Sequence, residues 1–502
     1  MTLLHEQNYI LNYESAVEAL KARPNDRELQ HRAVLSLARA GALHFAIAEF
    51  KRFGLGDVTG HEDIMALDGR LSKDLCLRNT GQVALGHAKD AAQKYEIAFE
   101  STQGYYSGIN SATMALIADM PVQDIMDRVA AVEVLLPSPE NLTPEDHYFI
   151  EATRAECHLL KGDHIAAVNS LQSAVNFDPM NFGAHATTLK QFNMIAKKRS
   201  ESTNWLNAFN PPRPTHFAGR IKIDLSGPQL EQLKIDLSDV IQKHDIGFGY
   251  GSLAAGYDIV ISEALLSEGA ALHVVLPCSV DRFFDHSVLP FGEDWASRFQ
   301  SCLTQSASLS ILSSHAPWPD PQVNRLTGQF AMGQAILMGH SLCVDPMQFI
   351  VLGENSDLSY TSKHALDWAL TGRRQLLLNS STQQEDALAM RKKKNFPGLV
   401  YSSITTAPKQ YASSRQALEA AIEIRKDSPK AKIALHTALP GVESDPTGLR
   451  ILEYGAPQSV LLSEAFASLL VFSEADNFDV TYAGLIEGGT GHPIRCYAVN
   501  AG

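Results

Sequence analysis

The chain has 502 residues, of which 45% are hydrophobic and 20% are charged, and its formal net charge is −14. This length predicts two to four domains, and the composition argues against intrinsic disorder. The negative charge argues against a DNA- or RNA-binding surface, because phosphate contacts need clustered lysine and arginine. The densest basic run, Arg391–Lys394, is short, and we interpret it as a solvated linker.

The cysteine pattern and the hydropathy of the chain bear on its location. The six cysteines are scattered, and none is spaced as CxxC. This pattern predicts reduced thiols in the cytoplasm rather than a disulfide framework or a metal site. The amino-terminal stretch lacks the basic start and apolar core of a signal peptide, and we find no apolar run long enough to cross a membrane.

Residues 1–205 show helical periodicity throughout, and we expect them to form one helical domain. In "AECHLLKGDHIAAVNSLQSAVNFDP", small residues fall where two helices of a tetratricopeptide-like hairpin would cross closely: Ala155, Gly162, Ala167 and Ala174, with Pro179 ending the unit. An earlier stretch repeats this spacing at Pro24, Gly41 and Ala46. We therefore predict a helical solenoid, with an irregular helical bundle as the alternative.

The remaining chain alternates between strand and helix patterns. Residues 201–216 contain three prolines and read as a linker. Residues 206–382 show strand patterns at "FAGRIKIDL", "ALHVVLP", "FIVLGE" and "RQLLLNSS", with helices between them, which predicts a Rossmann-like parallel sheet. Residues 383–502 predict a separate α+β domain. The expected fold is thus multi-domain, α followed by α/β.

A glycine-rich stretch, "GFGYGSLAAGYD", lies between an expected strand and an expected helix of the middle domain. Gly251 and Gly256 are spaced as in a P-loop, but Tyr257 stands where that motif needs lysine. The alternating glycines before Ser252 also fail the GxGxxG spacing. The sequence therefore excludes both of these phosphate-binding motifs, although a glycine turn before a helix still favours an anion.

The stretch "GSLAAGYDIVISEALLSEGAALHVVLP" resembles the SGxAxGxD…VVL pattern of the SLOG superfamily of Rossmann-like proteins. The resemblance implies that this turn binds a nucleotide or a nucleotide derivative, and the sequence identifies no cofactor beyond that. Some members cleave N-glycosidic bonds with a glutamate, and the weak candidate here is Glu263. The candidate ligand-binding residues are Gly219, Gly249, Gly251, Ser252, Gly256, Asp258 and Arg282. The alternative is purely structural: Gly256 would allow close packing, and Asp258 would cap the helix.

The helical region resembles the TRAFs-binding region of apoptosis-signal-regulating MAP3 kinases and of bacterial relatives. The resemblance covers about residues 25–195, and its most distinctive hexamer is "YYSGIN", Tyr105–Asn110. It implies a bacterial signalling protein whose solenoid binds protein partners.

The carboxyl-terminal domain resembles a shortened class III nucleotide cyclase, with "AKIALHTALPG" and "RILEYGAPQSVLLSEAFASLL" as its matching segments. The comparable strand carries Ser402 and Ser403 where a cyclase needs a metal-binding aspartate. We therefore expect a domain without cyclase activity, kept for pairing in a homodimer or for sensing. Arg450 and His436 are then structural residues.

Three further groups have a structural and a chemical interpretation. We interpret Cys278, which is near His273 in the sequence, as a buried thiol in preference to a nucleophile. The segment "SVDRFFDHSV" lacks a third metal ligand and reads as a surface loop beside the pocket, while Lys363 and Asp367 have the spacing of a surface ion pair. The chain as a whole predicts a regulatory scaffold that senses a nucleotide. The alternative is an enzyme of the N-glycosidic hydrolase type acting at the same pocket.

Overall fold

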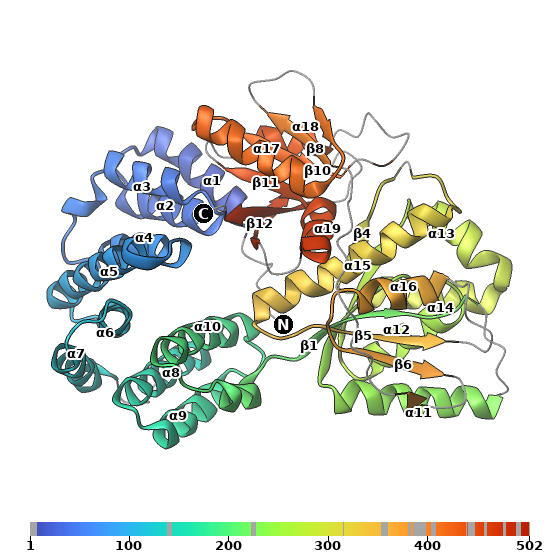
Figure 1. Ribbon diagram of the computed structural model, residues 1–502, viewed down its shortest axis with the longest axis horizontal. Coiled ribbons are helices and arrows are strands. Elements are labelled where there is room, and N and C mark those ends of the chain that lie inside the picture. The colour runs from blue at the N-terminus through green and yellow to red at the C-terminus, as the bar shows by residue number, and fades with distance from the viewer. Residues whose placement is uncertain are drawn as a thin grey trace.

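A computed structural model describes the chain in three parts (Figure 1). The described residues are 8–137, 143–221, 227–314, 316–352, 360–379, 383–384, 398–402, 408–437, 439, 447–455, 459–474, 478–487 and 493–500. The expected linker run at 391–394 and Ser403 lie outside them.

The amino-terminal part is helical, as predicted; each helix from α1 to α9 packs on the next, and α10 packs on α6 and α8 (Figure 1). Ala167 and Ala174 are fully buried where α8 and α9 pack together, and Gly162 adopts a left-handed conformation at the turn between them. Small residues permit this close approach. The helices are α1 (Tyr9–Ala22), α2 (Arg27–Arg39), α3 (Leu43–Arg52), α4 (Glu62–Arg78), α5 (Gly81–Thr102), α6 (Tyr105–Ile117), α7 (Val122–Leu135), α8 (Pro144–Lys161), α9 (His164–Phe177) and α10 (Phe182–Arg199).

The middle part is a Rossmann-like sheet in the order β4-β3-β2-β1-β5-β6-β7, in which the first six strands are parallel and β7 is antiparallel to β6. This confirms the predicted α/β class. The strands are β1 (Arg213–Ala218), β2 (Ile246–Gly251), β3 (Ala271–Leu276), β4 (Ser308–Ile311), β5 (Met347–Leu352), β6 (Gln375–Asn379) and β7 (Gln383–Gln384). The helices are α11 (Gly227–Lys243), α12 (Tyr257–Ser267), α13 (Val280–Ser287), α14 (Glu293–Gln305), α15 (Pro321–Leu342) and α16 (Tyr360–Ala369).

The prediction of a linker through residue 216 is wrong for residues 213–216, because β1 begins at Arg213 and lies between β2 and β5. Pro214 misled the prediction, since proline cannot donate to a sheet ladder and is rare in central strands. The structure accommodates it at the strand's start. The register with β2 shifts between Arg213 and Pro214, and the pairing with β5 begins only at Thr215.

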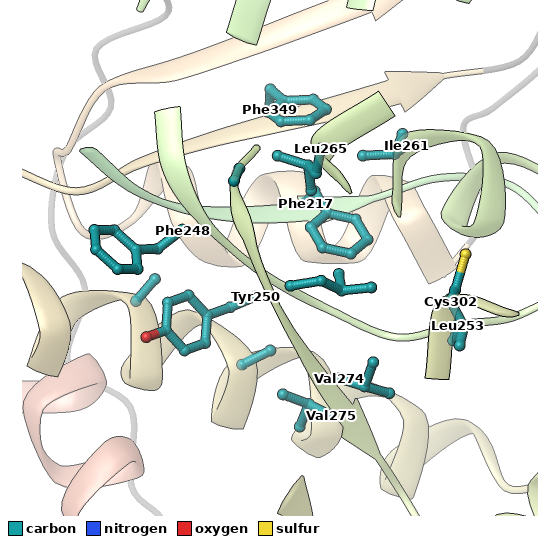
Figure 2. Close-up of a cluster of buried hydrophobic side chains, with 14 of the residues drawn as sticks. Phe217, Phe248, Tyr250, Leu253, Ile261, Leu265, Val274, Val275, Cys302 and Phe349 are labelled. Carbon is teal, nitrogen blue, oxygen red and sulfur yellow. The ribbon is translucent and has the colours of Figure 1, made fainter. Parts of the chain in front are cut away.

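The core of the middle part is built by alternate residues of its central strands (Figure 2). Phe248 and Tyr250 of β2 are buried on one face, and the intervening Gly249 lies against Leu265 of α12 on the other. Helix α15 also packs on β1, β2 and β3. The sheet is therefore covered on both faces, as its apolar strands require.

The carboxyl-terminal part is an α+β domain with a sheet in the order β12-β13-β11-β10-β8-β9. Its strands β10 and β11 are parallel, and its other neighbours are antiparallel. The elements are β8 (Gly398–Ser402), β9 (Lys409–Tyr411), α17 (Ser414–Asp427), β10 (Ile433–His436), α18 (Thr447–Tyr454), β11 (Val460–Ser463), α19 (Glu464–Glu474), β12 (Asp479–Ile486) and β13 (Ile494–Asn500).

The three parts contact one another pairwise, so the chain closes on itself (Figure 1). Helix α15 packs against α19, and Gly333 lies so close to the backbone of Ser468 that a Cβ would come 2.1 Å from its carbonyl oxygen. Phe182 of α10 contacts the ring of Phe248 in β2. Helix α1 packs on β12, which brings the first helix of the chain against its second-to-last strand.

Candidate functional site

The candidate site lies at the carboxyl ends of β1 and β2, where the glycine-rich turn (Gly251–Gly256) leads into α12. The strand order reverses direction at β1, because β2, β3 and β4 lie on one side of it and β5 and β6 on the other. Ligands of open parallel sheets bind outside the carboxyl ends of the strands at such a switch point. The turn predicted from the sequence therefore lies next to the position where this fold class binds ligands.

Asp258 joins the ends of the two strands. Its Oδ1 accepts a hydrogen bond of 2.7 Å from the amide of Gly219, which follows β1, and its Oδ2 accepts one of 3.3 Å from the amide of Ala254 in the turn. The side chain is buried. Burial raises the pKa of Asp258 from 3.8 to about 7, while the two amide donors oppose the shift. The site thus holds a carboxyl group that changes charge near neutral pH.

At Gly256 the turn comes close to the backbone of the segment after β1. Its φ is +112°, and a Cβ there would lie 2.6 Å from the carbonyl oxygen of Ile221. The amide of Tyr257 donates to the carbonyl oxygen of Arg220 at 3.0 Å. A glycine is required because a side chain would collide with backbone and because L-residues rarely adopt this φ.

The alternative in which Asp258 caps α12 is wrong. Gly256 is the N-cap of α12 and no side chain caps this end. Asp258 is already the second residue of the helix, so its carboxylate reaches back to Ala254 and across to Gly219. It ties two loops together instead of satisfying the first turn of the helix.

The other predicted glycines also serve close packing. A Cβ on Gly219 would lie 2.2 Å from the Cβ of Tyr257, and one on Gly251 would lie 2.6 Å from the ring of Phe217. Both glycines are at the strand ends, and Ser252 follows Gly251, half-buried in the turn. Gly249 lies further back, inside β2, where a Cβ would meet Leu265. It therefore positions α12 and is not part of the turn.

The structure pairs Glu263 and Arg282 with other segments. Both carboxylate oxygens of Glu263 accept bonds of 2.7 Å from Arg298 of α14, whose guanidinium also lies over the ring of Trp295. Arg282 lies on α13 and donates to the carbonyl oxygen of Ala316 at 3.0 Å. Glu263 therefore packs α12 against α14, and Arg282 ties α13 to the segment after β4.

The remaining candidates make structural contacts. Cys278 is buried, and burial raises the pKa of its thiol to about 11, which opposes the thiolate that a nucleophile needs. His273 Nδ1 lies 2.7 Å from the hydroxyl of Ser308. His436 is buried, with Nδ1 2.9 Å from the hydroxyl of Ser463, and the guanidinium of Arg450 donates to the carbonyl oxygen of Glu487 at 3.5 Å.

The expected surface ion pair between Lys363 and Asp367 is wrong. Asp367 faces the interior, where Arg325 of α15 donates two bonds of 2.7 and 2.6 Å to its carboxylate. Only 1% of the Asp367 side chain is exposed. The spacing of four residues shows which residues share a helix surface, but not which side of that surface is buried.

Sequence reasoning missed a polar network that joins four helices of the amino-terminal part. Lys73 of α4 donates to Asn110 of α6 at 2.9 Å and to Gln191 of α10 at 2.8 Å. Gln191 in turn donates to Glu156 of α8 at 2.8 Å, and Thr113 also donates to that carboxylate. Burial lowers the pKa of Lys73 and raises that of Glu156. The sequence signal for this network was a polar residue on each of the four helices.

Comparison with protein families matches residues 12–115 to TPR-S, described as Tetratricopeptide Repeats-Sensor. The amino-terminal region therefore contains a TPR-S domain, which runs from α1 into α6. No curated protein matches the chain. Among solved structures, Haemophilus influenzae LpoA in its monoclinic form is 11% identical over 65% of this chain and 70% of that chain, with a TM-score of 0.13. That score is too low to carry an argument about the fold.

Within the described ranges, no helix is both long and apolar enough to span a bilayer. The same part of the chain contains no group of three or more histidine, cysteine, aspartate or glutamate side chains placed to hold a metal ion.

Proposed function

We propose that the protein is a regulatory scaffold whose solenoid binds a protein partner and whose middle domain binds a nucleotide-type ligand. The observation that supports partner binding is the network from Lys73 to Glu156, which begins in the region that matches TPR-S, residues 12–115, and extends beyond it. Lys73 of α4 and Gln191 of α10 are half-buried, whereas Asn110, Thr113 and Glu156 are buried, so the network reaches solvent at Lys73 and Gln191. Helical solenoids use such extended faces for binding.

Partner binding is tested by cross-linking the full chain in cells and comparing the captured proteins between variants. A partner held by this face is lost with Lys73→Met and with Gln191→Leu. Lys161→Met is the matched control, because Lys161 forms its ion pair with Glu133 between the neighbouring helices α8 and α7. Melting temperatures identify variants that are merely unfolded. If every partner of the wild-type chain is captured equally by the folded variants, this face does not bind.

Nucleotide binding by the middle domain is supported by the position of the glycine-rich turn at the strand switch. The resemblance to SLOG proteins suggests the class of ligand, a nucleotide or a nucleotide derivative. The proposal retains the predicted residues that lie together at the ends of β1 and β2. They are Gly219, Gly251, Ser252, Gly256 and Asp258.

Thermal-shift measurements with ATP, GTP, NAD and ADP-ribose test this binding. Ser252→Glu places a negative charge in the turn, where it repels phosphate but suits the positive end of the α12 dipole. Ser267→Glu, at the other end of α12, is the control. We expect a nucleotide to raise the melting temperature of the wild type and of Ser267→Glu but not of Ser252→Glu. The absence of any wild-type shift with these nucleotides contradicts the proposal.

The alternative, an enzyme that hydrolyses an N-glycosidic bond, is tested by analysing nucleotide products after incubation. Glu263 is committed to Arg298, so Asp258 is the carboxyl group that remains at the turn. Product formation that disappears with Asp258→Asn would favour the enzyme.

We also propose a cytoplasmic location, supported by the six unpaired cysteines. The carboxyl-terminal domain is proposed to serve pairing or sensing, because Ser402 stands where cyclases carry a metal-binding aspartate. Formation of a cyclic nucleotide from ATP or GTP would contradict this.

A further inference from the structure

The two ends of the solenoid are held in different ways. At its carboxyl-terminal end, α10 continues through the chain into β1, and Phe182 packs on Phe248. At its amino-terminal end, α1 meets β12 only through non-covalent contacts, although the two elements are more than 450 residues apart. Opening the α1 end therefore breaks no chain connection.

Asn8 makes two hydrogen bonds at this contact. Its Oδ1 accepts from the amide of Leu11 at 3.1 Å, so it is the N-cap of α1. Its Nδ2 donates to the carbonyl oxygen of Leu485 in β12 at 2.7 Å. Strand β12 is the last strand of its sheet, so Asn8 occupies a hydrogen-bonding position on an otherwise open edge. One side chain thus links the start of α1 to the edge of the sheet.

The sheet is shaped to receive Asn8. The register of β12 and β13 shifts between Tyr482 and Gly484, and Gly484 has a φ of +147°. A Cβ on Gly484 would lie 2.3 Å from Oδ1 of Asn8 and 3.1 Å from the amide of Ile10. A bulge and a glycine on an edge strand commonly mark the close approach of another backbone.

The apolar part of the contact is small. Ile10 and Ala40 from the solenoid share a buried cluster with Leu461, Ala483 and other residues of the carboxyl-terminal domain. A cavity of about 10 Å³, enough for one water molecule, remains beside Tyr13, Leu37 and Leu461. Burial at the same contact raises the pKa of Glu14, and the nearby charge of Lys432 opposes this shift. The contact therefore combines polar and apolar groups, and its packing is incomplete.

The contact between the middle and carboxyl-terminal parts is different. Met332, Ile336 and Leu337 of α15 are buried in one cluster with Phe466 and Leu470 of α19. Gly333 lets the two helices touch at backbone distance. Dense apolar packing of this kind has a higher free energy of opening than a capped helix end on a sheet edge.

We propose that α1 is a reversible latch on β12. It opens as a unit and uncovers the edge of β12, while α15 and α19 stay packed. In the closed state Asn8, Ile10 and Gly484 hold the solenoid against the carboxyl-terminal sheet. This device does not depend on which partner or ligand the protein binds.

Amide hydrogen exchange of the full chain tests the latch, with Asn8→Ala as the first variant. Asp163→Ala is its matched control, because Asp163 caps α9 by accepting from Ala166 at 3.0 Å without a bond to another domain. In Asn8→Ala we expect exchange in Tyr9–Ala22 and in Asp479–Ile486 to rise together, by roughly tenfold or more. Asp163→Ala raises exchange only around α9.

Two results would overturn the latch. One is faster amide exchange in α1 while the amides of β12 exchange at the wild-type rate. The other is an equal rise in α15 and α19, which would mean that the domains open globally.

A double-mutant cycle makes the test independent of the folding of any one variant. Gly484→Ala pushes against Asn8 from the sheet side, so its effect on exchange in α1 should not add to that of Asn8→Ala. Additive effects would show that the alanine at 484 only strains β12, and would count against the proposal.

Discussion

The amide of Gly219 donates to the carboxylate of Asp258 at 2.7 Å, across 39 residues of chain. This bond joins the end of β1 to the first turn of α12, so the two segments of the candidate ligand site are fixed by one titratable group. Its protonation state is therefore coupled to the stability of the site.

The first prediction concerns this coupling. Burial raises the pKa of Asp258 from its ordinary value of 3.8 to about 7 in the folded protein. Because this carboxyl pKa is higher in the folded than in the unfolded protein, the protonated group favours the fold below about pH 4. This contribution to the free energy of unfolding is lost as the pH rises to about 7. Asp258→Asn mimics the protonated acid at every pH. We expect the free energy of unfolding of the variant to gain roughly 2 kcal/mol relative to wild type between pH 5 and pH 8.

Urea denaturation at the two pH values measures this difference. A constant gap between the two proteins would show that Asp258 keeps its ordinary pKa.

The second prediction concerns Gly256. Gly256→Ala places a Cβ 2.6 Å from the carbonyl oxygen of Ile221 at a φ of +112°. We expect a loss of about 2 kcal/mol or more, from both collision and backbone strain. Gly269→Ala, just beyond the other end of α12, has a φ of +78° and no atom within 4 Å. It should lose only about 1 kcal/mol, from backbone strain. Equal losses in thermal or urea unfolding would contradict the close approach.

The third prediction concerns the crossing of α8 and α9. Ala167 is fully buried there, so Ala167→Leu overpacks the hairpin and should cost about 1–3 kcal/mol. Asn169→Leu adds the same side chain at an exposed position of α9 and should change stability by less than about 0.5 kcal/mol. Circular dichroism melts of the two variants provide the comparison, and similar melting temperatures would argue against close packing.

The fourth prediction concerns the polar network of the solenoid. Lys73→Met leaves Asn110 and Gln191 without their donor in a half-buried site, which should cost about 1–3 kcal/mol. Lys161→Met removes a more exposed ion pair with Glu133 and should cost less than about 1 kcal/mol. Urea denaturation ranks the two. A smaller loss for Lys73→Met than for the control would show that the network contributes little to stability.

Much of the secondary structure was predictable from the sequence, because periodicity is a local property. The segment "SRQALEAAIEIRKD" is α17, Ser414–Asp427, and "ALHVVL" is β3. The helical amino-terminal region and the parallel middle sheet were both predicted, and the match to the TPR-S family supports the first. The error at Pro214 came from treating a residue preference as a rule. Strand β1 tolerates proline near its start because its pairing with β5 begins only after that residue.

The candidate site was predictable only in part. The sequence located the glycine-rich turn, and the structure places Gly219 beside it. Glu263 and Arg282 were selected by residue type, and the structure pairs each with a different segment. The resemblances to SLOG, TRAFs-binding and cyclase domains stay predictions, which the nucleotide, partner and cyclase experiments test.

The sequence by itself determined where most helices and strands form, that a glycine-rich turn ends at Gly256, and that small residues such as Ala167 allow close helix pairs. These properties depend on backbone preferences and on side-chain spacing within one segment. Only the tertiary structure decided that Asp258 binds Gly219, that Asp367 faces inward to Arg325, and that Asn8 reaches Leu485. A hydrophobic or polar pattern shows which face of an element is buried. Which partner covers that face depends on contacts between segments that are distant in the chain.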